Sequence, residues 1–244
     1  MVEPLPSSTV VVVRDSHRGP ELLLVRRRAG DAFGESYTFP GGVLDADEYE
    51  ARGACTGLSE EQSNDILGIE SGALDYYSAV VRELFEETGV LLGASDHIDD
   101  ELRRRLHCGE LPWRELLQQL GVSIHCDGLE YFAHWITPSA LPKRWTTRFF
   151  LAAMPEGQTI RPDNNEITDY CWATADEAMA SANSGERKIP FPTRRTIEDL
   201  AGKATVAELI EWARERQAAG IPAIQPEIRA DDGKRRIFMP EIDD

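Results

Sequence analysis

The segment R-E-L-F-E-E-T-G-V at residues 82–90 constrains the fold most, because it predicts a helix with two chemically different faces. At about 100° per residue, Glu83, Glu86 and Glu87 fall within one arc of about 100°. The opposite arc holds four apolar side chains, Val80, Val81, Leu84 and Phe85. Such a helix must lie with one side in a core and the other at a carboxylate-lined surface.

This helix is expected to run from about Tyr76 to Thr88, with Asp75 as its N-cap and Gly89 as its stop. Three carboxylates on one face repel each other unless positive charge lies among them, which favours a site for a hard divalent cation. Arg82 stands four residues before Glu86 and can pair with it. The alternative is an ordinary solvated acidic face.

Strands and helices mix without a regular βαβ alternation, which predicts an α+β fold. Strands are expected at 8–15, 21–28, 129–137, 144–153 and 167–172. Capping boxes predict helices after Ser59, Thr174 and Thr205, and two short helices are expected within 97–121. The helix at 205–219 carries one apolar stripe, so we expect it to pack on its own domain, with dimerisation as the alternative. The tail after Gly220 reads as largely irregular.

Composition narrows the range of partners. The 244 residues hold 26 Lys and Arg against 43 Asp and Glu, a net charge of −17 that disfavours nucleic acid. The apolar runs are much shorter than the ~20 residues of a membrane span. No secretory signal or peroxisomal tripeptide is visible, so we expect a soluble, cytoplasmic protein. We expect it to be a monomer or a homodimer. The four widely spaced cysteines are expected to be reduced.

The string at 82–90 resembles the second half of the Nudix box, G-x5-E-x7-R-E-U-x-E-E-x-G-U, where U is aliphatic. Phe39-Pro40-Gly41-Gly42 resembles the loop that opens this box. The Nudix family comprises metal-dependent hydrolases that cut a diphosphate joining a nucleoside to another group. The resemblance implies an α/β/α sandwich around a mixed sheet, here with a helical insertion and a C-terminal helical extension.

The box is interrupted. Gly42 and Arg82 stand 40 positions apart instead of 14, so about 26 extra residues lie inside it. Counted back from Arg82, the first glutamate of the box is replaced by Leu74, so that glutamate is expected to be lost. We predict a Nudix domain over residues 1–202 with its insertion at about 43–74. A C-terminal helix and tail at 203–244 is expected to pack on it.

An interrupted box also characterises a Nudix branch that includes the mammalian peroxisomal acyl-coenzyme A diphosphatase, which this chain resembles from about residue 9 to 200. The matching pieces are R-R-R-A-G-D-A-F, F-P-G-G-V-L-D-A-D, W-I-T-P, R-W-T-T-R-F-F and E-I-T-D-Y-C-W. The branch implies hydrolysis of coenzyme A or acyl-coenzyme A to 3′,5′-ADP and (acyl-)4′-phosphopantetheine. The arginine pattern of one group of coenzyme A-cleaving relatives is only partly present.

The resemblance implies roles for individual residues. Glu83, Glu86 and Glu87, with the Gly41 carbonyl, would bind Mg²⁺ or Mn²⁺, and Arg82 would orient Glu86. Glu166, in a loop before a strand, is predicted to be the general base, with a helix carboxylate or a plain solvated acid as alternatives. The residues predicted to contact substrate phosphates are Arg26, Arg28, Gly41, Gly42, Arg144 and Arg148.

Two other functions remain open at this point. One is Nudix pyrophosphohydrolysis of nucleotide sugars, ADP-ribose or dinucleotides. The other is a non-catalytic domain that senses a nucleotide. Three intact helix glutamates and the acidic charge, which opposes DNA, disfavour the sensor.

Overall fold

The computed structural model describes residues 2–30, 34–231 and 234–240. The helices are α1 (Asp47–Ala51), α2 (Glu60–Leu67), α3 (Ala73–Thr88), α4 (Asp100–His107), α5 (Trp113–Leu120), α6 (Ala175–Ser184), α7 (Phe191–Leu200) and α8 (Val206–Ala219). The strands are β1 (Leu5–Ser16), β2 (Gly19–Arg27), β3 (Tyr37–Thr38), β4 (Gly41–Val43), β5 (Cys55–Thr56), β6 (Ile124–His125), β7 (Glu130–Ile136), β8 (Trp145–Ala153), β9 (Ile167–Thr174), β10 (Ala223–Ile224), β11 (Glu227–Asp231) and β12 (Lys234–Phe238).

A mixed sheet forms the middle layer. Its order is β10-β7-β8-β1-β2-β3, while β4 pairs with β1 and β9 with β2. β1 runs parallel to β8 and antiparallel to β2 and β4, so one strand connects both halves of the sheet. The alternation of hydrophobic side chains explains why this strand is central: Val10 and Val12 face one core, and Val11 and Val13 the other.

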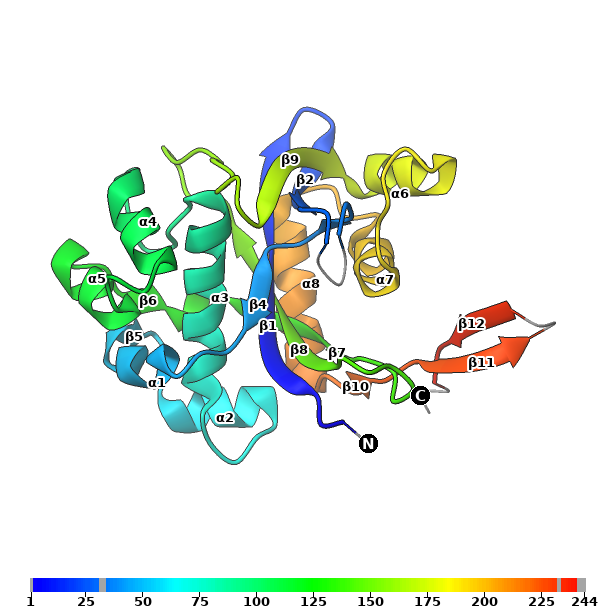
Figure 1. Cartoon of the computed structure of the whole chain (residues 1–244), viewed down its shortest axis with the longest axis horizontal. Coiled ribbons are helices and arrows are strands. Elements are labelled where there is room, and N and C mark those ends of the chain that lie inside the picture. The colour runs from blue at the N-terminus through cyan, green and yellow to red at the C-terminus, as the bar shows by residue number, and fades with distance from the viewer. Residues whose placement is uncertain (1, 31–33, 232–233, 241–244) are drawn as a thin grey trace.

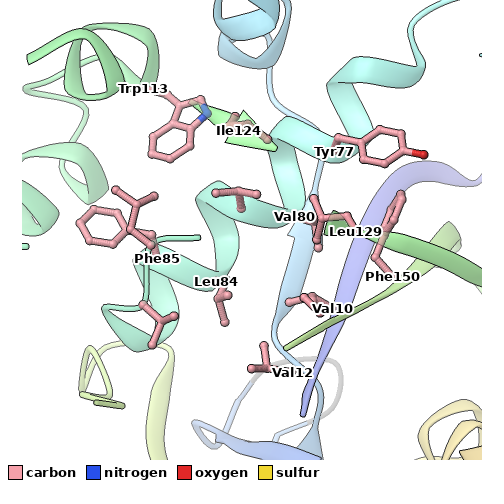
Figure 2. Packing of buried hydrophobic residues seen from close by; sticks show 14 of the residues in the cluster. Val10, Val12, Tyr77, Val80, Leu84, Phe85, Trp113, Ile124, Leu129 and Phe150 are labelled. Atoms are coloured by element: carbon pink, nitrogen blue, oxygen red, sulfur yellow. The ribbon is translucent and has the colours of Figure 1, made fainter. Parts of the chain in front are cut away.

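Helices cover both faces of the sheet. One face carries α3 and the insertion, and the other carries α6, α7 and α8 (Figure 1). The predicted α/β/α sandwich is therefore confirmed. Figure 2 shows Val80 and Leu84 of α3 directed toward Val10 and Val12 of β1, while Phe85 lies on the side of Trp113 from α5. The apolar arc read from the sequence is thus the buried side of α3.

Most expected elements are present, and two expectations are wrong. The central helix begins at Ala73 rather than Tyr76, with Gly72 in a left-handed conformation at φ 84° as its N-cap. Asp75 is not the cap; it binds Arg52 of the insertion through two bonds of 2.5 and 2.8 Å. The tail is not largely irregular either, because β11 and β12 form a hairpin after β10.

The insertion is more ordered than expected. Besides α2, which begins with the predicted capping box at Ser59, the segment between β4 and α3 contains α1 and the short strand β5. β5 pairs in parallel with β6, and this pairing joins the insertion to the segment that precedes β7. Along the described parts of the chain, each helix is too short or too polar to cross a lipid bilayer.

We expect the β7–β8 pairing to weaken in acid because of His134. Its Nε2 lies 2.7 Å from Oγ1 of Thr146, and burial, with Arg148 nearby, lowers the pKa of His134 to about 4. Because a histidine in the unfolded chain titrates near 6.5, the unfolded state binds a proton between about pH 6.5 and 4 that the folded state does not. The contribution is complete above pH 6.5 and is lost as the pH falls through this window.

Urea unfolding at pH 7.5 and pH 5 measures this effect. In His134→Gln, the loss of unfolding free energy between the two values should be smaller than in the wild type by about 1–2 kcal/mol. An identical loss in both proteins would contradict the assignment.

Candidate active site

The carboxylate face of α3 meets the β4 strand of the loop that opens the box. Because Val80, Val81, Leu84 and Phe85 are fully buried on the other side, the helix cannot rotate without exposing its core residues. Glu83, Glu86 and Glu87 are held at the junction of α3, β4 and β2. Glu87 is 3% exposed, and its Oε2 accepts a hydrogen bond of 3.1 Å from the Gly41 backbone nitrogen.

Arg82 is the centre of this junction. Its guanidinium, 8% exposed as a residue, binds Glu83 at 2.8 Å and Glu86 at 3.0 Å. It also donates to the carbonyl of Val43 at 3.2 Å. The predicted pair with Glu86 is therefore present. Arg82 fixes two carboxylates of α3 against the β4 strand.

A third carboxylate at Arg82 was missed by the sequence analysis. Glu48 is fully buried, and its Oε1 lies 2.5 Å from Arg82 Nε. Glu48 stands six positions after Gly42, the spacing of the first half of the box, so the expected loss of the first glutamate is wrong. The signal was visible by counting forward from Gly42. The insertion begins after Glu48, and Leu74 is instead a core residue of α3.

The glycine pair permits a close approach of backbone to side chains. A Cβ at Gly42 would collide with the Glu83 carboxylate. A Cβ at Gly41, whose φ is 152°, would lie 2.7 Å from the Cα of Thr9. Both positions therefore need glycine, because β4 packs between β1 and the carboxylates.

Arg27 brings Glu166 to the site. Its guanidinium contacts Glu87 at 3.1 Å and Glu166 at 3.3 Å, so it joins the helix to the loop before β9. Glu166 is half-exposed and lines the same cavity as Glu83 and Glu86. The structure thus brings the predicted general base beside the predicted metal ligands.

Four arginines predicted to bind phosphate do not line this cavity in the part of the chain that the structure describes, and each has another partner. Their contact with phosphate stays a prediction. Arg26 faces Glu35 at 3.8 Å, and Arg28 donates to the Asn164 carbonyl at 2.9 Å. Arg144 donates to the carbonyls of Thr137 and Val2. Arg148 lies over the Tyr76 ring at 4.3 Å, on the α3 side of the sheet.

Arg103 of α4 holds the end of α3, a role that the sequence did not indicate. Its Nε donates to the Glu86 carbonyl at 2.9 Å, and its Nη1 donates to the Arg161 carbonyl at 2.6 Å. The Arg161 backbone nitrogen in turn donates to the Thr88 carbonyl at 2.7 Å. These bonds satisfy carbonyls that the last helical turn leaves open, and they fix the turn that carries Glu86 and Glu87.

Burial changes the acidity of the site. It raises the pKa of Glu83 to about 7, against the opposing effect of Arg82. Burial is also the main cause that raises the pKa of Glu86 and, well above its usual range, that of Glu87. Neighbouring carboxylates contribute in the same direction. A cation among these groups would favour their charged forms.

The residues fit a divalent cation in their chemistry. Three acidic side chains and a flexible glycine carbonyl supply the oxygen donors that Mg²⁺ and Mn²⁺ prefer. As the side chains stand, no group of three His, Cys, Asp or Glu within the described ranges is placed to hold a metal ion. Glu83 and Glu86 turn to Arg82, and Glu87 turns to Arg27 and Gly41. Cation binding would therefore require carboxylate oxygens to exchange arginine for metal.

The site opens into a cavity of about 1060 Å³. Its lining includes the charged residues Arg27, Glu83, Glu86 and Glu166. It also includes apolar residues from β7, β8, the loop between them, α7 and the C-terminal hairpin: Trp135, Ile136, Leu141, Trp145, Phe149, Phe191, Ile228 and Ile237. The carboxylates and a large apolar lining therefore share one cavity.

The comparisons with known proteins agree with this fold. A NUDIX hydrolase from Alicyclobacillus acidocaldarius superposes with a TM-score of 0.76 at 23% identity, over 86% of this chain and 97% of that structure. The sandwich is thus the fold of a Nudix hydrolase. The family model described as the NUDT19 Nudix domain matches residues 55–197, more than half of the chain. The chain belongs to this family.

Two curated relatives are similar over most of the chain. The human acyl-coenzyme A diphosphatase NUDT19 is 26% identical over 248 residues, which cover 83% of this chain and 66% of the relative. The putative nudix hydrolase 7 of Caenorhabditis elegans is 27% identical over 174 residues, which cover 70% of this chain and 52% of the relative. The chain thus spans about two thirds of the human relative's length and about half of the worm's.

Removal of Glu48 is expected to destabilise the protein. Glu48→Ala leaves the buried Arg82 without one of its partners and frees the Asp45 amide that also binds Glu48. We expect a loss of about 2–4 kcal/mol in unfolding free energy. Urea denaturation at pH 7 measures it.

The matched control is Glu50→Ala on the same helix. Glu50 forms an exposed pair with Arg114 and should cost less than about 1 kcal/mol. Equal effects of the two substitutions would show that the buried pair with Arg82 adds nothing to stability.

Proposed function

We propose that this protein hydrolyses the diphosphate of coenzyme A or acyl-coenzyme A to 3′,5′-ADP and (acyl-)4′-phosphopantetheine. The observation that carries the proposal is that one cavity is lined by both carboxylates and large apolar side chains. The carboxylates suit metal-assisted attack on a diphosphate, and the apolar lining suits a long arm of low polarity. A nucleoside triphosphate or a dinucleotide offers no such arm.

The human relative's name supports this substrate class, although only part of that protein is matched. Arg27 and Lys143 both line the cavity and supply the positive charge that binding of an anion needs in a chain of net charge −17. Gly41 and Gly42 add backbone that phosphate oxygens can approach closely.

We assign the following roles to the chain's own groups. Glu83, Glu86 and Glu87, with the Gly41 carbonyl, would hold Mg²⁺ or Mn²⁺. When bound, such an ion acidifies water and neutralises phosphate oxygens. Glu166 accepts the proton of the attacking water. Arg27 keeps Glu166 beside the helix carboxylates, since it contacts Glu87 and Glu166 together. Arg82 orients Glu83 and Glu86.

The reaction is tested by incubating the protein with coenzyme A and an acyl derivative, with Mg²⁺ and with Mn²⁺. We expect 3′,5′-ADP and a phosphopantetheine product, resolved by mass, and no products in EDTA. ADP-ribose, a nucleotide sugar and a dinucleotide form the comparison panel. Cleavage confined to that panel would refute the coenzyme A assignment and keep the chemistry, whereas no cleavage anywhere would favour the nucleotide sensor.

The substitutions Glu86→Gln and Glu166→Gln distinguish a metal ligand from a general base. Loss of a metal ligand in Glu86→Gln should raise the metal concentration for half-maximal activity and lower turnover by orders of magnitude. Loss of the base in Glu166→Gln should lower kcat on the order of a hundredfold or more without changing that concentration.

Glu156→Gln, an exposed loop substitution outside the cavity lining, is the control and should leave both quantities unchanged. Near wild-type turnover in Glu166→Gln would move the base to a carboxylate of α3. Unchanged metal dependence in Glu86→Gln would remove Glu86 from the ligand set.

A further inference from the structure

The C-terminal hairpin places two isoleucines on one of its faces. In its register Ile228 of β11 is the cross-strand partner of Ile237 of β12, so both side chains lie on one face. Glu227, Arg229 and Phe238 belong to the other face by the alternation of a strand. The hairpin extends from the body of the molecule beyond β10 (Figure 1).

The isoleucine face belongs to the cavity of the active site. Ile228 and Ile237, together with the buried Pro226 at the start of the hairpin, line the cavity that also contains Glu83 and Glu86. Ile237 remains 44% exposed, so its face still has apolar surface to bury. An isolated two-stranded hairpin is marginally stable in water, and contact with an apolar group would stabilise it.

The same cavity has further apolar lining outside the hairpin. This lining includes Trp145 at the start of β8, Leu141 in the loop before it and Phe191 at the start of α7. Phe191 makes an edge-on contact with Trp135, with ring centroids 6.2 Å apart. The hairpin isoleucines and these residues therefore line one cavity together with the carboxylates.

We propose that the hairpin face Ile228–Ile237 is the wall that selects an acyl chain, so that the protein prefers acyl-coenzyme A over free coenzyme A. This inference rests on the proposed function. The occupant must carry a diphosphate at one end, because the same cavity contains the carboxylates, and an apolar chain at the other. A second copy of this chain does not provide that combination.

The experiment compares kcat/KM for octanoyl-coenzyme A with kcat/KM for coenzyme A under identical metal conditions. Both substrates undergo the same reaction at the diphosphate, so the ratio of the two kcat/KM values reports only the effect of the acyl chain. In the wild type the ratio should exceed one and increase with chain length, by up to roughly threefold for each methylene group that becomes buried. In the double variant I228S/I237S the ratio should fall on the order of tenfold.

The matched control is Arg229→Ser on the other hairpin face, where Arg229 pairs with Glu227 in the open. It should keep the wild-type ratio. Circular dichroism and gel filtration of all three proteins check that the fold and the oligomeric state are unaltered.

The measured ratios test the role of the hairpin separately from the proposed reaction. A ratio that is near one in the wild type, or equal in I228S/I237S and the wild type, overturns the hairpin's role and leaves the proposed reaction standing. A dimer that dissociates in I228S/I237S would overturn it in favour of a contact between copies. If the wild type cleaves neither substrate, the proposed function itself fails.

Discussion

The buried guanidinium of Arg82 is the interaction on which the rest of the site depends. A charge that is 8% exposed is tolerated only with partners, and it collects them from three segments: Glu48 before the insertion, Val43 of β4, and Glu83 and Glu86 of its own helix. The loop and α3 are therefore joined even though some 26 residues intervene. Because the insertion leaves after Glu48 and returns to α3, its two ends stay close and a long excursion costs little loop entropy.

The same junction concentrates negative charge that the fold must offset. Burial raises the pKa of Glu83, Glu86 and Glu87, so their charged forms are disfavoured relative to solvent-exposed glutamates. Arg82 and Arg27 offset this cost from opposite sides of α3 and also fix the carboxylates in place. A divalent cation would compete with these arginines for the same oxygens. In this arrangement the arginines keep the site folded, and the acidic chain still presents oxygen donors at the cavity.

The resemblance to the Nudix box implied the sandwich, and local patterns predicted the apolar arc of α3 and the capping boxes at Ser59 and Thr174. The sequence did not indicate the contacts that depend on long-range packing. Arg27 rather than Arg26 or Arg28 reaches the carboxylates, because it shares the strand parity of Leu23 and Val25, which pack on the α3 side. Arg148 shares the strand parity of Phe150 and lies over Tyr76 of α3, whereas Trp145 and Thr147 line the cavity. Arg103 reaches the end of α3 only through tertiary packing.

Chemistry and substrate choice are separated along this chain. The carboxylates, their arginines and the glycine pair lie between residues 27 and 87, with Glu166 added from the loop before β9. The apolar lining is built mainly from later segments: the β7–β8 region, the start of α7 and the C-terminal hairpin. The two sets are linked through β1, which pairs with β4 on one side and with β8 on the other. The hairpin lies outside this pairing, since β11 and β12 pair only with each other among the strands of the described residues. If the hairpin acts as we propose, its selectivity is limited by how firmly its isoleucine face is held.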